Sequence, residues 1–256
     1  MIFTIKDSSG KVVRKFNKAP KKGVQRFQWD LRRTPKDAIS LRKPSFYNPF
    51  AGTKQGPFVA PGNYTVSMET YINGETTSVG TPVTFAVKAL NNTVLPAEDR
   101  VAKAAFQQEV EELKRAMQGA QRTISEMDNK LKHIREAIKV VEQPSTNLTA
   151  AANAIDTKLD AIKRQFFGDR IKSRLDMQAP PTPLRRLGSV QYEQGNSTAS
   201  PTKTHQASLA IAKEEFAPIL SAIRAVADED MVKLEEQLES VSAPYTPGRK
   251  TKVFKN

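Results

Sequence analysis

Histidine and cysteine are the first residues to examine for catalysis or metal binding, because imidazole and thiolate serve as bases, nucleophiles and ligands. The chain of 256 residues contains two histidines, His133 and His205, and no cysteine. The histidines are far apart in the sequence, and neither lies in an E-x-x-H pair that would bind a metal. The absence of cysteine excludes disulfides, thiolate metal sites and a cysteine nucleophile. We therefore expect exposed histidines on helices, no metal site and no cofactor.

Carboxylate pairs are the next candidates, because two carboxyl groups can act as acid and base in glycoside cleavage. Examples of such pairs are Glu111-Glu112, Glu214-Glu215 and Glu235-Glu236. Each lies in a lysine-rich helical pattern, where we expect solvated faces with ion pairs four residues apart. The chain also lacks a G-x-S-x-G motif, a phosphate-binding loop and a G-x-G-x-x-G motif. We expect this chain not to be an enzyme, while the activity of a longer parent protein stays open.

A proline-interrupted stretch, residues 34–57, combines arginine and aromatic residues without a regular period. A loop of this length in a compact domain is usually either functional or disordered. Aromatic and arginine side chains together suit contact with a glycan or with a protein surface. The candidate contact residues are Arg42, Phe46, Tyr47 and Phe50. In the alternative interpretation, these aromatic residues cap a sandwich or pack against a neighbouring domain.

The chain is basic, with 40 Lys and Arg against 27 Asp and Glu and a formal net charge of +13. A charge of this size permits nucleic acid, anionic lipid or acidic glycans as partners, but it requires none of them. The sequence has neither the aromatic and arginine motif of an RNA-binding sheet nor a Cys/His finger, so we do not expect nucleic acid. Its apolar runs are too short to span a bilayer, so we expect no transmembrane segment.

The chain begins directly in a β-prone run, and no signal peptide precedes it. This is typical of a piece cut from a longer protein, and a native start at Met1 is the alternative. Turn signals separate several short strand patterns in residues 1–92, and the strongest hairpin signal is Asn73-Gly74. Alternation at Phe27, Trp29 and Leu31 predicts a half-buried strand. We predict an immunoglobulin-like antiparallel β-sandwich over residues 1–92.

A heptad pattern of apolar and small residues runs through residues 106–141, with spacings that alternate between four and three. It predicts a helix over residues 96–142, which needs at least one helical partner to cover its apolar seam. Pro144 ends this helix, and a second helix is predicted over residues 147–175. The seam residues are Phe106, Val110, Leu113, Met117, Ala120, Ile124, Met127, Leu131, Ile134, Ile138 and Val141.

Proline and glycine residues without a period predict an exposed loop over residues 178–201. A third helix is predicted over residues 203–241, where Pro218 should kink or break it. Short connections make these helices antiparallel neighbours, which predicts a three-helix antiparallel bundle over residues 96–245. A basic tail is predicted over residues 243–256. The predicted fold class is therefore multidomain, a β-sandwich followed by a bundle of long helices.

Four stretches of the sequence together carry a resemblance to a known family. They are residues 3–14 (F-T-I-K-D-S-S-G-K-V-V-R), 22–32 (ending in W-D-L-R), 56–66 (with P-G-N-Y-T-V) and 243–249 (A-P-Y-T-P-G-R). They resemble the C-terminal region of exported bacterial proteins, mostly from Bacteroidetes, that carry a sortilin-like or sialidase-like BNR-repeat β-propeller. These proteins are often described as glycosyl hydrolases. The W-D-L-R and P-G-x-Y pair is also similar to the immunoglobulin-like module of the flagellar hook-capping protein.

The resemblance implies a propeller upstream of this chain and a location outside the bacterial cytoplasm, in the periplasm, at the cell surface or secreted. It implies that any active site lies on the propeller, since this chain has no Asp box. The expected function is therefore a non-catalytic region that docks on its own propeller or on an envelope protein. The alternatives are a glycan-contacting part of a glycoside hydrolase, or an adaptor whose heptad helix pairs with another chain. The motif residues, expected to be structural, are Trp29, Asp30, Arg32, Pro61, Gly62, Tyr64, Pro247, Gly248 and Arg249.

Overall fold

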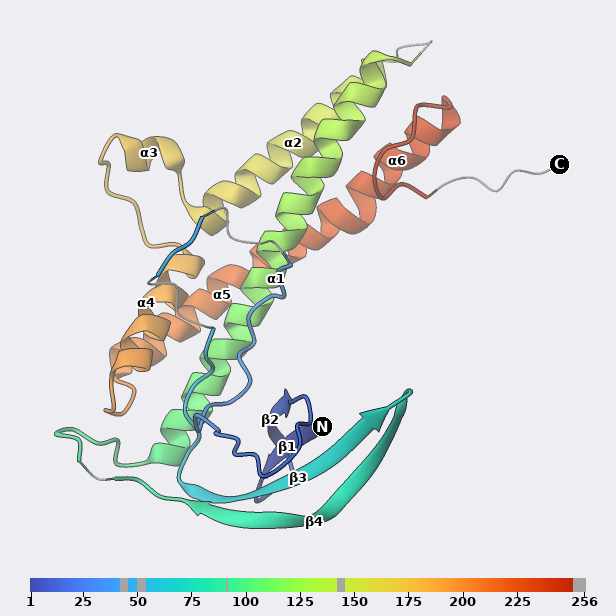
Figure 1. The fold of residues 1–256 in the computed structure, drawn as a ribbon. Coiled ribbons are helices and arrows are strands. Elements are labelled where there is room, and N and C mark those ends of the chain that lie inside the picture. Colours follow the sequence, from blue (N-terminus) through green and yellow to red (C-terminus); the bar gives the residue numbers. More distant parts are fainter. Residues whose placement is uncertain (42–45, 50–53, 91, 142–145, 251–256) are drawn as a thin grey trace. The chain divides into compact units, whose positions relative to one another are not determined.

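Four antiparallel strands form one sheet in the N-terminal part of the chain, in the order β2-β1-β3-β4. Figure 1 shows β3 and β4 as a long, curved hairpin. The strands are β1 (Ile2–Asp7), β2 (Val12–Asn17), β3 (Gly62–Ile72) and β4 (Glu75–Val87). The computed structural model describes residues 1–41, 46–49, 54–90, 92–141 and 146–250 of the chain.

The hairpin predicted at Asn73-Gly74 is confirmed by the pairing of β3 with β4, and β1 pairs with β2 in a second hairpin. Asn73 and Gly74 connect β3 to β4 with φ values of 50° and 90°. Positive φ at both central residues is what a two-residue type I′ hairpin turn requires, and the Asn-Gly pair tolerates it at low cost. This turn explains why the sequence signal at Asn73-Gly74 was reliable.

The predicted strand at Phe27, Trp29 and Leu31 is wrong, because this segment forms only an isolated bridge, between Arg32 and Phe58. The alternation is nevertheless present in the burial, since Phe27 and Trp29 are half-buried and their neighbours are exposed. The segment covers the sheet with side chains rather than by a hydrogen-bonded ladder. The strands that the structure describes belong to one antiparallel sheet, so the second sheet of the sandwich stays a prediction.

An apolar cluster holds this covering segment on the sheet. Ile5, on β1, is opposite Val66 on β3, so their side chains lie on the same face. Burial of such side chains contributes about 1.5–3 kcal/mol each to folding. The cluster consists of Ile5, Val13, Val59 and Tyr64, with Phe16, Trp29, Val66, Phe85 and Val87 packed around them.

The rest of the described chain is mainly helical. The long helix is shorter than the predicted 96–142, because the Asp99 carboxylate accepts hydrogen bonds from the backbone N–H groups of Val101 and Ala102 at 2.8 and 2.9 Å and fixes the helix start. The helices are α1 (Arg100–Lys139), α2 (Thr146–Phe167), α3 (Arg170–Arg174), α4 (Pro183–Asn196), α5 (Lys203–Ala225), the π-helix η1 (Val226–Asp230) and α6 (Met231–Ser240).

The predicted helix over residues 147–175 is wrong at its C-terminal end. Helix α2 ends at Phe167, since Gly168 follows with a φ of 96°, in the left-handed region that favours glycine. The Asp169 side chain then caps the separate helix α3 by accepting from the N–H groups of Ile171 and Lys172. Hydrogen bonds from these two groups lower the pKa of the Asp169 carboxyl.

The predicted loop over residues 178–201 is also wrong, because α4 occupies Pro183–Asn196. Thr182 Oγ1 accepts the N–H of Arg185 at 3.3 Å, and Pro183 takes the first helical position, where its missing N–H costs nothing. Leu187 and Val190 are buried three residues apart on this helix. The clustered prolines before α4 therefore mark its start.

Pro218 does not break the third predicted helix, because α5 continues across it from Lys203 to Ala225. The irregularity is the π-helix η1, which follows α5 and contains Asp228, Glu229 and Asp230. Such single π turns are usual as local insertions in α-helices. Helix α6 continues from η1 to Ser240.

Contact clustering divides the chain into two compact units. The first unit comprises Met1–Lys114 and Gln191–Thr204, and the second comprises Arg115–Val190 and His205–Asn256. The boundary thus falls within α1 and α4 rather than at the predicted 92–96 junction. Among the described residues, no helix is long and apolar enough to cross a membrane.

Ion pairs connect the helices of the second unit around its buried side chains. Of the predicted seam, Phe106 is half-buried and the other positions are buried. The pairs are Arg135–Asp156 at 2.9 Å and Lys163–Asp128 at 2.7 Å between α1 and α2, Lys158–Asp230 at 2.7 Å between α2 and η1, and Lys130–Glu235 at 3.1 Å between α1 and α6.

Candidate functional site

The two N-terminal sequence motifs meet in the first unit. The Trp29 ring makes edge contacts with Tyr64 at 5.6 Å and with Phe85 at 6.1 Å, measured between ring centroids. Trp29 Nε1 donates a hydrogen bond to the Arg32 carbonyl at 3.0 Å, and the Tyr64 hydroxyl donates to the Ala60 carbonyl at 2.6 Å. Burial raises the pKa of Tyr64, so its hydroxyl stays a donor.

Arg32 fixes the covering segment to the chain that leads into β3. Its Nη1 donates to the Gly56 carbonyl at 3.0 Å, and its guanidinium carbon lies 3.7 Å from the ring centroid of Phe58. Asp30 Oδ1 accepts the backbone N–H of Arg32 at 3.1 Å. Pro61 and Gly62 follow Ala60 directly and start β3. The contacts of all four residues, Trp29, Asp30, Arg32 and Tyr64, therefore lie within the first unit.

The C-terminal motif folds back onto the second unit. Arg249 is buried, with Nε 2.6 Å from Glu239 Oε1 and Nη2 donating to the Ala243 carbonyl at 2.7 Å. Pro247 and Gly248 form a turn, in which Gly248 has a φ of 81°. The predicted basic tail is therefore wrong over residues 243–250, because Arg249 makes a buried ion pair instead of facing solvent. Residues 251–256 lie outside the described part.

The predicted contact surface is described only in part, because Arg42 and Phe50 lie outside the described residues. Phe46 and Tyr47 are largely exposed. Earlier in the same segment, Lys36 pairs with Glu112, and Asp37 lies 3.1 Å from Lys114 Nζ. Charged groups at the start of the 34–57 segment therefore hold it against α1.

One member of each carboxylate pair is exposed, as predicted, at Glu112, Glu214 and Glu236, and the other member is not. Glu111 is buried rather than solvated, with Oε1 3.5 Å from both Lys114 Nζ and Gln191 Nε2. Glu215 pairs with Arg186 on α4 at 3.3 Å. These partners come from other helices or from a position three residues away, so the predicted spacing of four residues does not account for them. They hold helices together, which is a structural use of acidic residues.

The two histidines show no shared site. His133 is exposed, as predicted, and its Nδ1 lies 2.8 Å from the Asn129 carbonyl. His205 is half-buried on α5 rather than exposed. The described residues hold no group of three or more His, Cys, Asp and Glu side chains placed to bind a metal.

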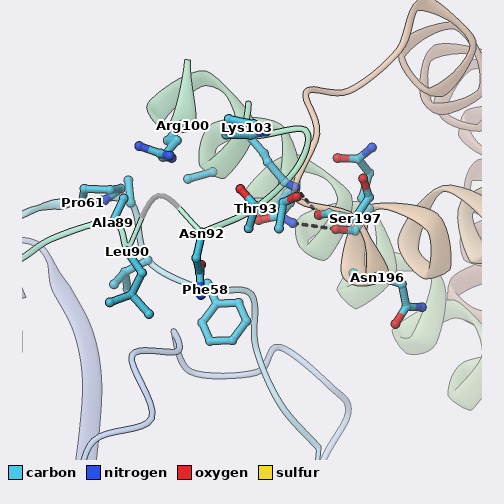
Figure 2. Close-up of a pocket in the computed structure, with 18 residues that line it drawn as sticks. Phe58, Pro61, Ala89, Leu90, Asn92, Thr93, Arg100, Lys103, Asn196 and Ser197 are labelled. Atoms are coloured by element: carbon cyan, nitrogen blue, oxygen red, sulfur yellow. Dashed lines mark hydrogen bonds between the residues drawn. The ribbon is translucent and has the colours of Figure 1, made fainter. Parts of the chain in front are cut away.

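A hollow of the first unit is a candidate site that the sequence interpretation missed. Its volume is about 480 Å³. Phe58, Pro61 and Leu90 line one side of it, and Arg100 and Lys103 of α1 line the other (Figure 2). An apolar wall opposite two cations suits a segment that presents an apolar side chain beside a carboxylate.

Lys103 makes a hydrogen bond beside this hollow. Its Nζ donates a hydrogen bond to the Ser197 carbonyl, which Figure 2 shows as a dashed line. Burial lowers the pKa of Lys103. The hollow combines residues from three distant stretches, and the only sequence signal was a row of apolar residues, Leu90, Val94 and Leu95, next to the basic start of α1.

Comparison of the chain with protein-family models, with curated proteins and with solved structures finds no match.

Proposed function

We propose that this chain is a non-catalytic docking region of an extracytoplasmic bacterial protein. It binds the β-propeller of its own parent, or an envelope protein, through the hollow of the first unit and the apolar residues beside it. The observation that carries the proposal is the exposure of large apolar side chains there, since Leu90 is 86% and Val94 is 96% exposed. Leu95 and Val101 are also more than half exposed. Large apolar side chains that are exposed close together in the sequence favour an interaction site.

The charge around this surface favours a partner with acidic groups. Arg100 and Lys103 line the hollow, and Lys88 is a further cation just before Ala89. Opposite charges at an interface guide association and fix its orientation more than they increase affinity. The apolar residues would therefore supply most of the affinity, and the cations would select the partner.

The motif residues have structural roles, which leaves docking to other side chains. Trp29 and Tyr64 pack inside the first unit, and Arg249 is buried in the second. Side chains used in this way are unavailable for a ligand. In the proposed fold, the covered sheet belongs to an immunoglobulin-like sandwich, and α1, α2 and the α5 to α6 run form a three-helix antiparallel bundle.

The first test of the proposal is the gene sequence that precedes the codon of Met1. The sequence upstream of Met1 is expected to encode a β-propeller with Asp boxes of the type S-x-D-x-G-x-T-W. Produced separately, that propeller and this chain are expected to bind each other in calorimetry. Replacing Leu90 and Val94 by aspartate is expected to weaken binding about tenfold or more, because charged groups then enter an apolar contact.

A matched control is a double substitution at exposed apolar positions of the second unit, Ile211→Asp with Val232→Asp. It should leave binding unchanged while adding the same charge. The proposal is wrong if no propeller or envelope protein binds, if both double variants bind equally well, or if the purified chain cleaves a glycoside.

A second candidate function is contact with glycans, which the exposed neighbours Phe46 and Tyr47 favour. Aromatic side chains that are exposed together can stack on apolar faces of a sugar. Affinity electrophoresis in gels that contain polysaccharide is expected to show retardation, which Tyr47→Ala abolishes and Tyr71→Ala, at an exposed tyrosine of β3, does not. Equal mobility of all three proteins would eliminate this candidate.

The adaptor alternative loses its interface, because it required the heptad seam to be open. Met117, Ile134 and Leu131 are buried within the chain, as are the other seam positions of the second unit. Pairing with another chain through this seam would first have to separate α1 from its own neighbours. The internal use of the seam therefore favours the docking proposal.

A further inference from the structure

The segment around α3 exposes apolar side chains in an ordered conformation. Ile171 is 67% exposed and Leu175 is 64% exposed, and Met177 is also more than half exposed. Figure 1 shows this segment leaving the end of α2 and returning to the start of α4, with α3 at its far side. We name residues 167–185 the α3 tip. Because the second unit leaves these side chains in water, their exposure costs free energy that a partner would recover.

Hydrogen bonds define the α3 tip, so its exposed residues are held in place. Asp169 Oδ1 accepts from the N–H groups of Ile171 and Lys172 at 2.8 and 3.2 Å. The backbone N–H of Met177 donates to the Lys172 carbonyl at 3.0 Å. Ile171 and Leu175 are four residues apart on α3 and its C-cap, which places them on the same side of this helical turn.

Arginine residues surround a hollow beside these apolar side chains. The hollow has a volume of about 370 Å³, and Arg170, Arg174 and Arg185 line it together with Ser173, Thr182 and the carboxylate-bearing Asp169. In the part of the chain that the structure describes, none of these three guanidinium groups forms an ion pair with a carboxylate. The Asp169 carboxylate, whose Oδ1 caps α3, offsets one of these three positive charges, so the hollow keeps an excess of positive charge that a bound anion would offset.

We propose that the α3 tip docks on the surface of an anionic phospholipid membrane. The arginine-lined hollow takes a lipid phosphate, since guanidinium groups bind phosphate oxygens with two parallel hydrogen bonds. Ile171, Leu175 and Met177 enter the boundary between head groups and acyl chains. This combination of apolar side chains and cations is what binds proteins to the interface of anionic membranes.

A membrane fits this surface better than an acidic protein does. A flat membrane is reached by parts that extend from a compact unit, and within the second unit the α3 tip extends from the ends of α2 and α4 (Figure 1). The tip also places apolar residues beside the arginine-lined hollow, since Met177 lines it and Ile171 and Leu175 lie on the adjacent helical turn, so apolar and cationic groups adjoin as they do in a phospholipid. An acidic peptide would explain the arginines but would need its own apolar residues at matching positions.

The test is sedimentation of the full chain with vesicles. Binding is expected with vesicles of phosphatidylcholine mixed with phosphatidylglycerol, and much weaker binding with phosphatidylcholine alone. Raised salt should weaken the binding to anionic vesicles, because salt screens the attraction of the arginines. Arg170→Glu with Arg174→Glu is expected to reduce binding about tenfold or more. Ile171→Asp with Leu175→Asp should reduce vesicle binding by a similar factor. This pair changes the net charge less than the two arginine substitutions do.

The matched control is Arg122→Glu with Lys132→Glu, which reverses two exposed cations elsewhere in the second unit. It is expected to retain most of the binding, and circular dichroism should show that all variants are folded. Equal loss in this control would show adsorption by net charge and overturn the proposal. Binding of inorganic phosphate without binding of vesicles would show a soluble phosphate site instead. Binding of poly-glutamate but not of vesicles would show an acidic protein partner.

Discussion

Replacing Phe166 by alanine is expected to lower the free energy of unfolding of the second unit by about 3–5 kcal/mol. The Phe166 side chain is fully buried, and its ring stacks on Phe216 with 5.6 Å between the centroids. Truncation removes apolar surface from the core, leaves a cavity between α2 and α5, and removes the ring pair. Because a domain is stable by only about 5–15 kcal/mol, this loss is a large part of the total.

The neighbouring residue provides a matched control for this substitution. Phe167 is 41% exposed and its ring contacts that of Phe166 at 4.8 Å. Phe167→Ala is expected to cost less than about 1 kcal/mol, because much of its surface is already in water. Urea unfolding followed by circular dichroism at the helix band measures both losses. Equal losses in the two variants would contradict the packing of Phe166 described here.

The heptad seam shows what could be predicted from the sequence. A strict four-three spacing has few structural explanations, and the buried positions from Val110 to Val141 follow it. The Asn73-Gly74 turn is a similar case, since two positive φ values restrict the residue types. Local geometry determines both features, so residues close in sequence were sufficient to identify them.

Features that depend on distant contacts were missed. Arg249 looked like part of a basic tail, but its ion pair with Glu239 can form only because residues 243–250 fold back on α6. Glu111 looked solvated in its own helical pattern, and Gln191 on α4 helps to bury it. Periodicity within one helix cannot show which side chains another helix will cover.

The candidate sites differ in the same way. The docking hollow combines Phe58, Leu90 and Ser197, three stretches that no sequence spacing relates to one another. The α3 tip has a local signal, because Ile171 and Leu175 are four apart beside arginines at Arg170 and Arg174. In the sequence prediction these residues belong to the end of one helix over residues 147–175. The structure places them in the separate helix α3 and its C-cap, with their side chains exposed.

Replacing Gly56 by alanine is expected to destabilise the first unit by about 3 kcal/mol or more. A Cβ atom at Gly56 would lie 2.2 Å from the Arg33 carbonyl oxygen and 2.9 Å from the Arg33 carbonyl carbon. These are backbone atoms, so a side chain cannot rotate away to relieve the clash. The chain segments around Gly56 and Arg33 would have to move apart.

That separation would break the contacts which hold the covering segment. The Arg33 N–H donates to the Pro57 carbonyl at 2.9 Å, the Val59 N–H donates to the Leu31 carbonyl at 2.9 Å, and Arg32 donates to Gly56 itself. Trp29 lies in the covering segment and is the single tryptophan of the chain. Its fluorescence therefore reports on the first unit, and Gly56→Ala is expected to shift its emission to the red and to lower the urea midpoint.

The same substitution at Gly119 should have the opposite sign. Gly119 lies inside α1, and a Cβ atom there would meet no neighbour within 4 Å. Alanine restricts the unfolded chain and favours the helix, so Gly119→Ala is expected to raise stability by about 0.5–1 kcal/mol. If Gly56→Ala were as stable as the unsubstituted chain while Gly119→Ala gained stability, the close approach of Gly56 to Arg33 would be absent in solution. If only Gly56→Ala loses stability, the W-D-L-R segment is held on the sheet by a close backbone contact between Arg33 and Gly56. Any side chain at position 56 would disrupt this contact.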